Sequence, residues 1–509
     1  MLSAVRAVAT AAVVVGALAG ASTAIAATPA ETKALREAVT AAGIMQHENA
    51  FQTIADMNGG TRASGTAGYD ASLAYVQDKL EDTGYFDTRV QGFDFDFFQE
   101  TAPAQFERLS PTARTYALTD DFLTMEYSGS GDVTGSIVPT NDVVLPPGPT
   151  ASSSSSGCEA SDFAPASASE PQVALTQRGT CDFVVKAENA EAAGYDAVII
   201  FNEGQEGRQE ALNGTLGGVG VGIPVIGTSF AVGEELYNLD GQGDAVVRIA
   251  TFTKAETRHT ANLLAETKTG RDDRVVVVGS HLDSVPEGPG INDNGSGSAQ
   301  DLEVALQMAK LEIDPRNKVR FAWWGAEESG LIGSQHYVDS LTARQLKNIA
   351  VNLNFDMVGS PNFVRFVYDG DGSSFGVGDT GSGVVEKVFN DYFASRDLET
   401  EPTEFDGRSD YQAFQLAGIP AGGLFTGAEE VKSAEEAAVY GGTAGIAYDP
   451  CYHQACDDID NLSQTALSQM SNATAHATLS FAQTTSAIEG ADKGKAKGQS
   501  EFLGSSLRK

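Results

Sequence analysis

The stretch VRFAWWGAEESGLIGS, residues 319–334, decides the fold class of this chain. Its first half is an apolar run typical of a buried strand, and its second half begins a helical pattern. Two adjacent carboxylates, Glu327 and Glu328, stand between them. Carboxylates at the mouth of a buried strand must be solvated, paired or bound to metal. The stretch therefore places charged chemistry at the end of a core strand.

The same alternation of strand and helix continues on both sides of this stretch. Apolar strands such as RVVVVGS (274–280) and IAVNLNFDMVG (349–359) alternate with helical patterns such as SAQDLEVALQMAKLE (298–312). Strands that are apolar throughout are typical of a mostly parallel sheet buried on both faces. We therefore predict an α/β fold with a doubly wound, mostly parallel sheet flanked by helices.

The 509 residues have room for two or three domains. From about residue 128 the pattern changes to short strands, turns and a Pro/Ser-rich loop, and the regular alternation resumes near residue 261. We read the block between as an α+β module inserted into a larger domain. The predicted divisions are 1–26 (signal peptide), 27–127 (N-terminal part of the main domain), 128–253 (inserted module), 254–489 (main part) and 490–509 (flexible tail).

The first 26 residues predict a secreted, extracellular protein. They contain an early cation, Arg6, then an apolar run, then Ala24-Ile25-Ala26 as a cleavage site with small residues. The apolar run is shorter than the ~20 residues of a spanning helix, so we favour export over a membrane anchor. The formal net charge of −36 argues against nucleic acid or an anionic membrane as partners.

Four cysteines in an exported chain suit two disulfides, and the sequence alone allows three pairings. We favour the local pairs Cys158–Cys181 and Cys451–Cys456, because each pair then lies within one module. A structural zinc held by cysteines is disfavoured, since the cysteines are widely scattered. Calcium is compatible with so acidic a chain, but no loop of EF-hand spacing supports it.

Candidate ligands for a metal follow the predicted strands. Open α/β sheets bind ligands outside the carboxyl ends of their strands. Carboxylates gathered there would repel one another, and divalent cations would remove that cost. Imidazole with carboxylate suits zinc, with manganese or cobalt as substitutes, and the number of ligands fits two ions sharing a bridging carboxylate. The residues at these strand ends are His281, Asp283, Asp293, Glu327, Glu328, Asp356 and His453, of which Glu328 would bind metal and Glu327 would remain unligated as the general base.

A family resemblance rests on five motifs in order. HLDSVPEGPGINDNGSG, WWGAEESGLIGS, NFDMVGS, GRSDYQAF and CYHQACDD together resemble the co-catalytic dizinc aminopeptidases secreted by Streptomyces-like bacteria. The resemblance covers about 255–480 and the predicted helices within 30–100. It implies a zinc-peptidase fold and an enzyme that binds two zinc ions and removes residues from peptide or protein N-termini.

The resemblance also implies a role for each residue. One zinc would be held by His281 and Asp356, the other by Glu328 and His453, and Asp293 would bridge them. Glu327 matches the general base, Tyr452 the hydroxyl that stabilises the oxyanion, and Asp283 a hydrogen-bond partner of the His281 imidazole. Met357, Arg408 and Phe425 match substrate-pocket positions, although Tyr411 stands where many members have histidine. The Cys451–Cys456 bridge resembles the family's own.

The inserted module resembles a protease-associated domain through VALTQRGTCDFVVKAENAEAAGYDAVIIFNE (173–203) and IPVIGTSF (223–230). Such domains carry no catalytic residues, so none is assigned here. The sequence thus predicts a secreted zinc aminopeptidase with a preference for apolar N-terminal residues. Two alternatives stay open: a dizinc carboxypeptidase, which would need a basic cluster for the substrate carboxylate, and a non-catalytic, receptor-like binding protein on the same scaffold.

Overall fold

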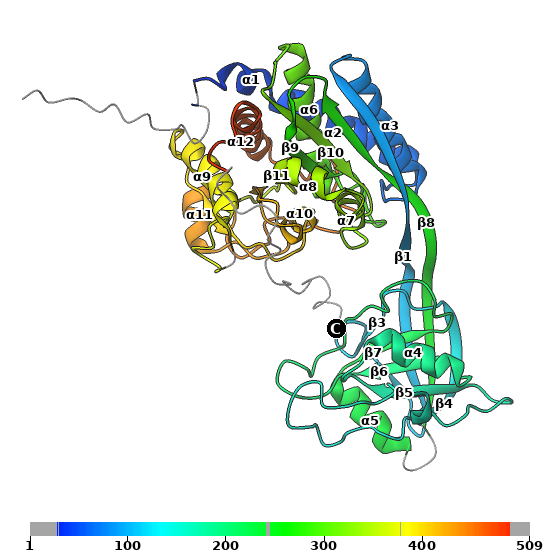
Figure 1. Cartoon of the computed structure of the whole chain (residues 1–509). Coiled ribbons are helices and arrows are strands. Elements are labelled where there is room, and N and C mark those ends of the chain that lie inside the picture. Colours follow the sequence, from blue (N-terminus) through cyan, green and yellow to red (C-terminus); the bar gives the residue numbers. More distant parts are fainter. Residues whose placement is uncertain (1–27, 29, 241–244, 377, 489–509) are drawn as a thin grey trace, which may run out of the picture.

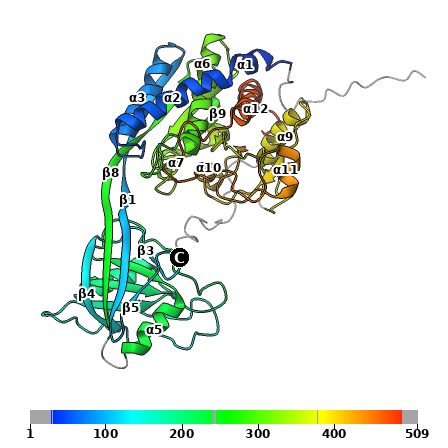
Figure 2. The same ribbon diagram turned by 180° about the vertical axis from the view of Figure 1, so that it is seen from behind.

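The computed structural model of the chain describes residues 28, 30–240, 245–376 and 378–488. It has two lobes joined by a ribbon of two long antiparallel strands, β1 (Phe86–Ser110) and β8 (Val246–Thr267) (Figures 1 and 2). The large lobe holds α1–α3, α6–α12 and β9–β14, and the small lobe holds β2–β7, α4 and α5. The predicted signal peptide and tail lie outside the described residues.

The large lobe is built on parallel strands. In sheet order, β14 (Ala421–Phe425), β11 (Ile349–Phe355), β9 (Arg271–His281) and β10 (Asn317–Trp324) are mutually parallel. Strand β8 pairs antiparallel with β10, while β12 (Phe366–Tyr368) and β13 (Glu401–Thr403) extend the other edge. The predicted mostly parallel sheet is confirmed.

Helices cover both faces of this sheet, as alternate residues of β9 demonstrate. Val276 and Val278 pack in a core with residues of α1–α3, α6, α9 and α12, whereas Val275 and Val277 pack with residues of α7, α8 and α10. The doubly wound arrangement is therefore present. The helices are α1 (Lys33–Ala38), α2 (Ala41–Met57), α3 (Ala67–Glu81), α6 (Gly297–Lys310), α7 (Ile332–Asp339), α8 (Ala343–Asn348), α9 (Thr380–Ala394), α10 (Tyr411–Leu416), α11 (Ala434–Tyr440) and α12 (Gln464–Gln483).

The small lobe repeats this layering at a smaller scale. Helix α5 (Phe230–Asp240) packs on one face of its sheet and α4 (Phe183–Ala192) on the other. Strands β4 to β7 are parallel, and β3 and β8 are antiparallel to their neighbours. The strands are β2 (Arg114–Thr115), β3 (Phe122–Thr124), β4 (Gly131–Pro139), β5 (Gln172–Gln177), β6 (Ala197–Phe201) and β7 (Val225–Thr228).

The ribbon makes the two lobes one continuous sheet. Strands β1 and β8 pair from Phe86 opposite Thr267 to Ser110 opposite Val246, and β8 pairs with β10 in one lobe and β4 in the other. Strand β1 has entered the small lobe before residue 128, where composition suggested a boundary. Among the described residues, no helix has the length and apolar character needed to cross a bilayer.

Candidate active site

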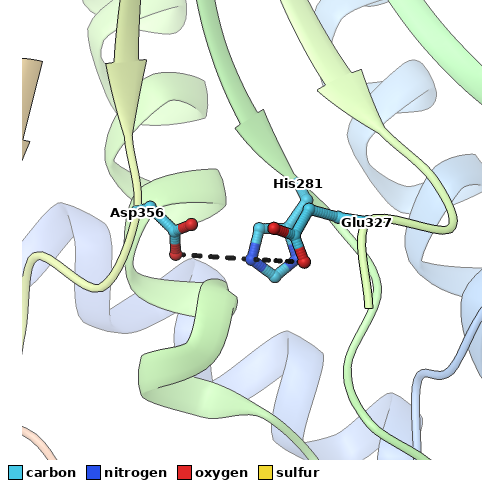
Figure 3. A group of neighbouring side chains, drawn as sticks. All are labelled: His281, Glu327 and Asp356. Atoms are coloured by element: carbon cyan, nitrogen blue, oxygen red, sulfur yellow. Dashed lines mark ion pairs between the residues drawn. The ribbon is translucent and has the colours of Figure 1, made fainter. Parts of the chain in front are cut away.

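Parallel strands bring the candidate residues to one edge of the large-lobe sheet. Strand β9 ends at His281, β10 ends at Trp324 shortly before Glu327, and β11 ends directly before Asp356. Figure 3 shows these three side chains converging from neighbouring strand ends. Because the strands run in register, with Trp324 opposite His281, the apolar sequences of the strands set the spacing of the site.

The first half of the site is centred on the His281 imidazole. Its Nε2 lies 3.2 Å from Asp293 Oδ1 and 3.3 Å from Asp356 Oδ1. Glu327 Oε2 is farther away, at 3.9 Å. Asp293 comes from the helical segment Ile291–Ser296 that leads into α6.

The second half is centred on His453, in the loop between α11 and α12. Its Nε2 lies 3.1 Å from Glu328 Oε2 and 3.2 Å from Asp293 Oδ2. The disulfide Cys451–Cys456 closes this loop, and the structure also forms the Cys158–Cys181 pair. Asp293 therefore lies between two imidazoles and turns one carboxylate oxygen toward each. This is the position that a bridging ligand requires.

Burial and mutual repulsion perturb the acids of this cluster. Burial, reinforced by the Asp293 charge, raises the pKa of Glu328 to about 7. Burial also raises the pKa of Glu327 well above its usual range, although His281 opposes the shift. Burial alone would lower the pKa of His281, but the carboxylates of Glu327 and Asp356 outweigh it and raise that pKa. The cluster is thus poised to accept positive charge.

The donor set fits divalent metal. Ligand atoms of His281, Asp293 and Glu328 lie within 4.8 Å of one another, as do those of His281, Glu327 and Asp356. The buried Glu328 Oε1 has no hydrogen-bond partner among the described residues. His281 Nδ1 contacts the Asp283 carbonyl at 3.1 Å, so a proton on Nδ1 leaves the Nε2 lone pair facing the carboxylates. That tautomer fits a cation between Nε2 and the carboxylates.

Asp283 contacts the His281 imidazole through its main chain. The imidazole contacts the main-chain oxygen of Asp283, and the carboxylate lies farther away, with Oδ1 at 3.6 Å from Nδ1. That carboxylate accepts the backbone N–H of Glu327 at 3.3 Å. Asp283 therefore links the end of β9 to the turn after β10.

Two residues that hold the metal-facing acids escaped the sequence reasoning. Ser409 Oγ donates to Asp356 Oδ2 at 2.6 Å and accepts from Asn354 Nδ2 at 2.8 Å. The Asp457 carboxylate accepts the backbone N–H of Asn292 and of Asp293, each at 2.9 Å. Both residues stand inside quoted motifs, GRSD and CYHQACDD, but nothing in the motifs identifies the partner.

A third overlooked residue, Arg62, supports the loop between β9 and α6. This fully buried guanidinium donates to the carbonyls of Leu282, Pro289 and Gly290. The residue lies in the turn between α2 and α3, more than two hundred positions from that loop in the chain. No local sequence signal connects the two.

Backbone strain is concentrated next to the cluster. Ala326, Met357 and His453 have positive φ angles of 54°, 51° and 56°. Non-glycine residues in this region cost of order 1–3 kcal/mol each and persist only where the surroundings enforce them. Ala326 precedes Glu327 and Met357 follows Asp356, so the strain lies where side chains are aimed into the site.

Arg408 and Tyr452 border the cluster. Arg408 Nη2 donates to the Tyr452 hydroxyl at 3.1 Å, and its Nη1 pairs with Glu429 at 2.9 Å. Both line one cavity of about 100 Å³ together with the metal-facing residues, Met357 and Phe425. The structure therefore brings all the expected pocket residues together.

Tyr411 has a supporting position. It is buried outside the cavity lining, donates from its hydroxyl to Asp406 Oδ1 at 2.8 Å and accepts from the Gly407 N–H at 2.8 Å. It therefore fixes the turn that presents Arg408.

An α/β sheet with a buried imidazole and carboxylate cluster at its carboxyl edge fits a metal-dependent hydrolase. The sequence profile of Peptidase family M28 matches residues 262–478, and that of the PA domain matches residues 126–236. An aminopeptidase of Pseudomonas aeruginosa is 46% identical over 458 residues, which cover 89% of this chain and 83% of that protein. The chain therefore belongs to Peptidase family M28, and it carries an inserted PA domain.

Other proteins agree with this assignment. A probable lipoprotein aminopeptidase of Mycobacterium tuberculosis, LpqL, is 42% identical, covering 88% of this chain and 86% of that protein. An aminopeptidase from Aneurinibacillus sp. strain AM-1 shares the fold with a TM-score of 0.64 at 23% identity, covering 88% and 95% of the two chains. BSAP, a zinc aminopeptidase from Bacillus subtilis, has a TM-score of 0.55 at 25% identity, covering 86% and 94%.

Proposed function

We propose that this chain is an exported aminopeptidase that uses two zinc ions to hydrolyse the first bond of peptides, with a preference for apolar N-terminal residues. The observation that carries the proposal is the position of Asp293, with one oxygen 3.2 Å from each of two imidazoles. The relatives named aminopeptidases and the zinc aminopeptidase from Bacillus subtilis support it.

The ligands divide into two groups around Asp293. His281 and Asp356 would hold one ion, Glu328 and His453 would hold the other, and Asp293 would contact both. When bound, zinc polarises a carbonyl oxygen and lowers the pKa of water. Ser409, Asp457 and Arg62 keep the ligands and their loops in place.

Glu327 has the properties of a general base. Its carboxylate faces the cluster but lies farther from His281 Nε2 than Asp293 or Asp356 does, so it is free to move a proton. Burial raises its pKa well above the usual range, which makes the carboxylate a stronger proton acceptor. Glu327 would take a proton from the attacking water and return it to the leaving amine.

Tyr452 would donate its hydroxyl proton in a hydrogen bond to the oxyanion. Burial raises the pKa of Tyr452 well above its usual value, so the phenol stays protonated and can donate. Arg408 Nη2 occupies an acceptor position of the same oxygen at 3.1 Å, which orients the O–H.

The substrate side chain would enter the cavity beside the metals. Met357 and Phe425 supply apolar surface there, and Tyr368 and Ala428 extend it. These contacts favour an apolar N-terminal residue.

The cation content of the cavity disfavours the carboxypeptidase alternative. Arg408 is the guanidinium among the lining residues, and it is already paired with Glu429 at 2.9 Å. A site that holds a substrate carboxylate needs an available basic group. Retention of the complete ligand set together with Glu327 disfavours the receptor-like alternative.

Export is supported by the disulfides and by the sequence of the first residues. Both bridges join cysteines that are close in sequence, and bonds of this kind persist in oxidising compartments.

The test compares leucine p-nitroanilide with its N-acetylated form, using protein as purified, after chelation and after zinc is restored. Zinc-dependent cleavage of the free-amine substrate alone supports an aminopeptidase, and titration of the metal-free protein should end at about two zinc ions per chain. If neither substrate is cleaved while both ions are bound, the proposal fails, and N-blocked peptides with free carboxylates then test the carboxypeptidase.

A further inference from the structure

A cleft of about 530 Å³ connects the candidate active site to the small lobe. Glu327, Glu328, Tyr452 and His453 line its catalytic end. Its far wall comes from the ribbon and the small lobe, namely Phe98, Glu100, Leu123, Thr124, Glu126, Asn213, Gly214 and Thr215. A peptide whose first bond lies at Glu327 and Tyr452 can extend along this cleft, since the cavity beside them has about 100 Å³, room for the first side chain.

Among the described residues that line the far wall, Glu100 and Glu126 are negatively charged and none is a cation. Glu100 accepts a hydrogen bond from the neutral Thr124 hydroxyl. Glu126 is fixed through its main chain, which pairs with Gly214 and Leu216, and this leaves its half-buried side chain at the cleft. The small-lobe and ribbon residues that line the cleft in the described part of the chain include no lysine or arginine.

The ribbon residue Lys254, which is adjacent in sequence to the partner of Glu100, points away from the cleft. Lys254 lies opposite Gln99, whereas Thr253 lies opposite Glu100, so Lys254 projects from the other face of the ribbon. There it pairs with Glu256 at 3.0 Å. Arg408 lines the cleft from the large lobe, but its charge is compensated by Glu429 at 2.9 Å.

We propose that Glu100 and Glu126 make the small lobe a specificity element that favours substrates with lysine or arginine in the third and fourth positions. The inference rests on the proposed aminopeptidase function. A carboxylate that has no ion-pair partner attracts an ammonium or guanidinium more strongly at the wall of a cleft than in open solvent. The first residue would be selected by the cavity at the metals, and the residues after the scissile bond by the opposite lobe.

The experiment measures kcat/KM for two amidated peptides, Leu-Ala-Lys-Lys-Ala and Leu-Ala-Glu-Glu-Ala, alongside leucine p-nitroanilide, which is too short to reach the far wall. The wild type should favour the lysine peptide. In the Glu100→Gln/Glu126→Gln variant the lysine-to-glutamate ratio should fall by about two- to fivefold for each carboxylate removed. Glutamine keeps the shape and the hydrogen bond from Thr124.

A matched control separates the local effect from the large negative charge of the whole chain. Glu170→Gln/Glu206→Gln removes the same charge from exposed small-lobe positions outside the cleft and should leave the ratio unchanged. An equal fall in both variants, or no fall in the cleft variant, overturns the inference while leucine p-nitroanilide is still cleaved. A wild type that fails to cleave leucine p-nitroanilide overturns the proposed function and the inference with it.

Discussion

The two lobes use the same topological position in opposite ways. In each, parallel strands end at one edge of a sheet, and polar side chains follow. In the small lobe these side chains bond to their own loops: Gln177 exchanges hydrogen bonds with the backbone of Val144, and Glu203 pairs with Arg208 at 2.6 Å. In the large lobe the corresponding acids face imidazoles and one another.

The comparison shows that the fold places polar side chains at the strand ends in both lobes. The hydrogen-bond and ion-pair partners available there decide whether these side chains are structural or reactive. Where a loop supplies partners, as Arg208 does, a buried acid contributes to structure. Glu203 and Glu328 each keep one buried oxygen without a hydrogen-bond partner among the described residues. The other oxygen of Glu203 pairs with a guanidinium, whereas that of Glu328 faces His453, and burial together with the charge of Asp293 raises the pKa of Glu328. A ligand can therefore offset the cost of burial at Glu328. The same strand-end position therefore becomes structural in one lobe and reactive in the other.

The strongest test of this difference between the lobes is to neutralise one acid in each. Glu327→Gln should lower kcat for leucine p-nitroanilide by about 10²- to 10⁴-fold, because it removes the proton acceptor and preserves side-chain shape. Zinc content, measured by mass spectrometry of the purified protein, should stay the same. Loss of zinc would identify Glu327 as a ligand and contradict its role as base.

The matched change in the small lobe is Glu203→Gln. Its Oε2 accepts from Arg208 and from the Ser152 N–H at 2.9 Å. The variant should lose about 1–3 kcal/mol of stability in denaturant unfolding, because it weakens a buried charge-assisted contact. Its kcat should equal that of the wild type. A fall in kcat would mean that this small-lobe acid also takes part in catalysis, contrary to the proposed difference between the lobes.

Removing each disulfide extends the comparison. Cys158–Cys181 closes a separation of 23 residues and Cys451–Cys456 one of 5, so the chain-entropy model assigns them about 3 and about 2 kcal/mol. Double serine variants should therefore lose more stability in the small lobe. The large-lobe variant should lose about tenfold or more in kcat/KM, because its loop carries Tyr452 and His453. Thermal unfolding and kinetics measured on the same samples test both expectations. A larger loss of stability in the large-lobe variant, or a larger loss of kcat/KM in the small-lobe variant, would contradict them.

Each lobe contains a buried basic side chain that should make its stability depend on pH, over a different pH range in each lobe. Burial, with help from Arg36 and Arg396, lowers the pKa of His476 in the large lobe from 6.5 to about 4. The unfolded chain then binds a proton that the folded protein does not, so stability should fall as pH drops through that window, by about 1.4 kcal/mol per unit. His476→Asn should flatten this dependence in urea titrations.

In the small lobe the corresponding window is alkaline. Burial lowers the pKa of Lys186 from 10.5 to about 8. The unfolded chain again binds the extra proton, so stability should rise as pH increases from 8 toward 10.5. Lys186→Met should remove that rise and leave the acid window intact. If both variants lost the pH dependence of stability over the same pH range, the assignment of His476 to the acid range and Lys186 to the alkaline range would be wrong.

The sequence predicted the strand-end residues because apolar strands are local patterns. His281 ends β9, Asp356 directly follows β11 and Glu327 lies shortly after β10, and parallel pairing of the strands brings the three to one edge of the sheet. The partners that orient the ligands could not be predicted. Asp457 reaches the Asp293 backbone across 164 positions, and Arg62 reaches Pro289 across 227. Pairings of this range depend on how whole elements pack, which no local pattern encodes.

The path of the ribbon was equally inaccessible to composition. Strand β1 continues from one lobe into the other through Glu100 and Ala102, where its register with β8 shifts. Nothing in the residue types marks this passage, because alternating apolar and polar side chains suit a strand in either lobe.

The smallest effects should come from removing one buried hydroxyl in each lobe. Tyr195→Phe in the small lobe deletes a hydrogen bond to the Ala164 carbonyl at 3.0 Å and should lower stability by about 1 kcal/mol without changing kinetics. Tyr411→Phe deletes the bonds to Asp406 and Gly407, which fix the turn carrying Arg408. It should also raise KM for leucine p-nitroanilide, by at most about fivefold. Equal KM values in both variants would mean that the turn is held without Tyr411.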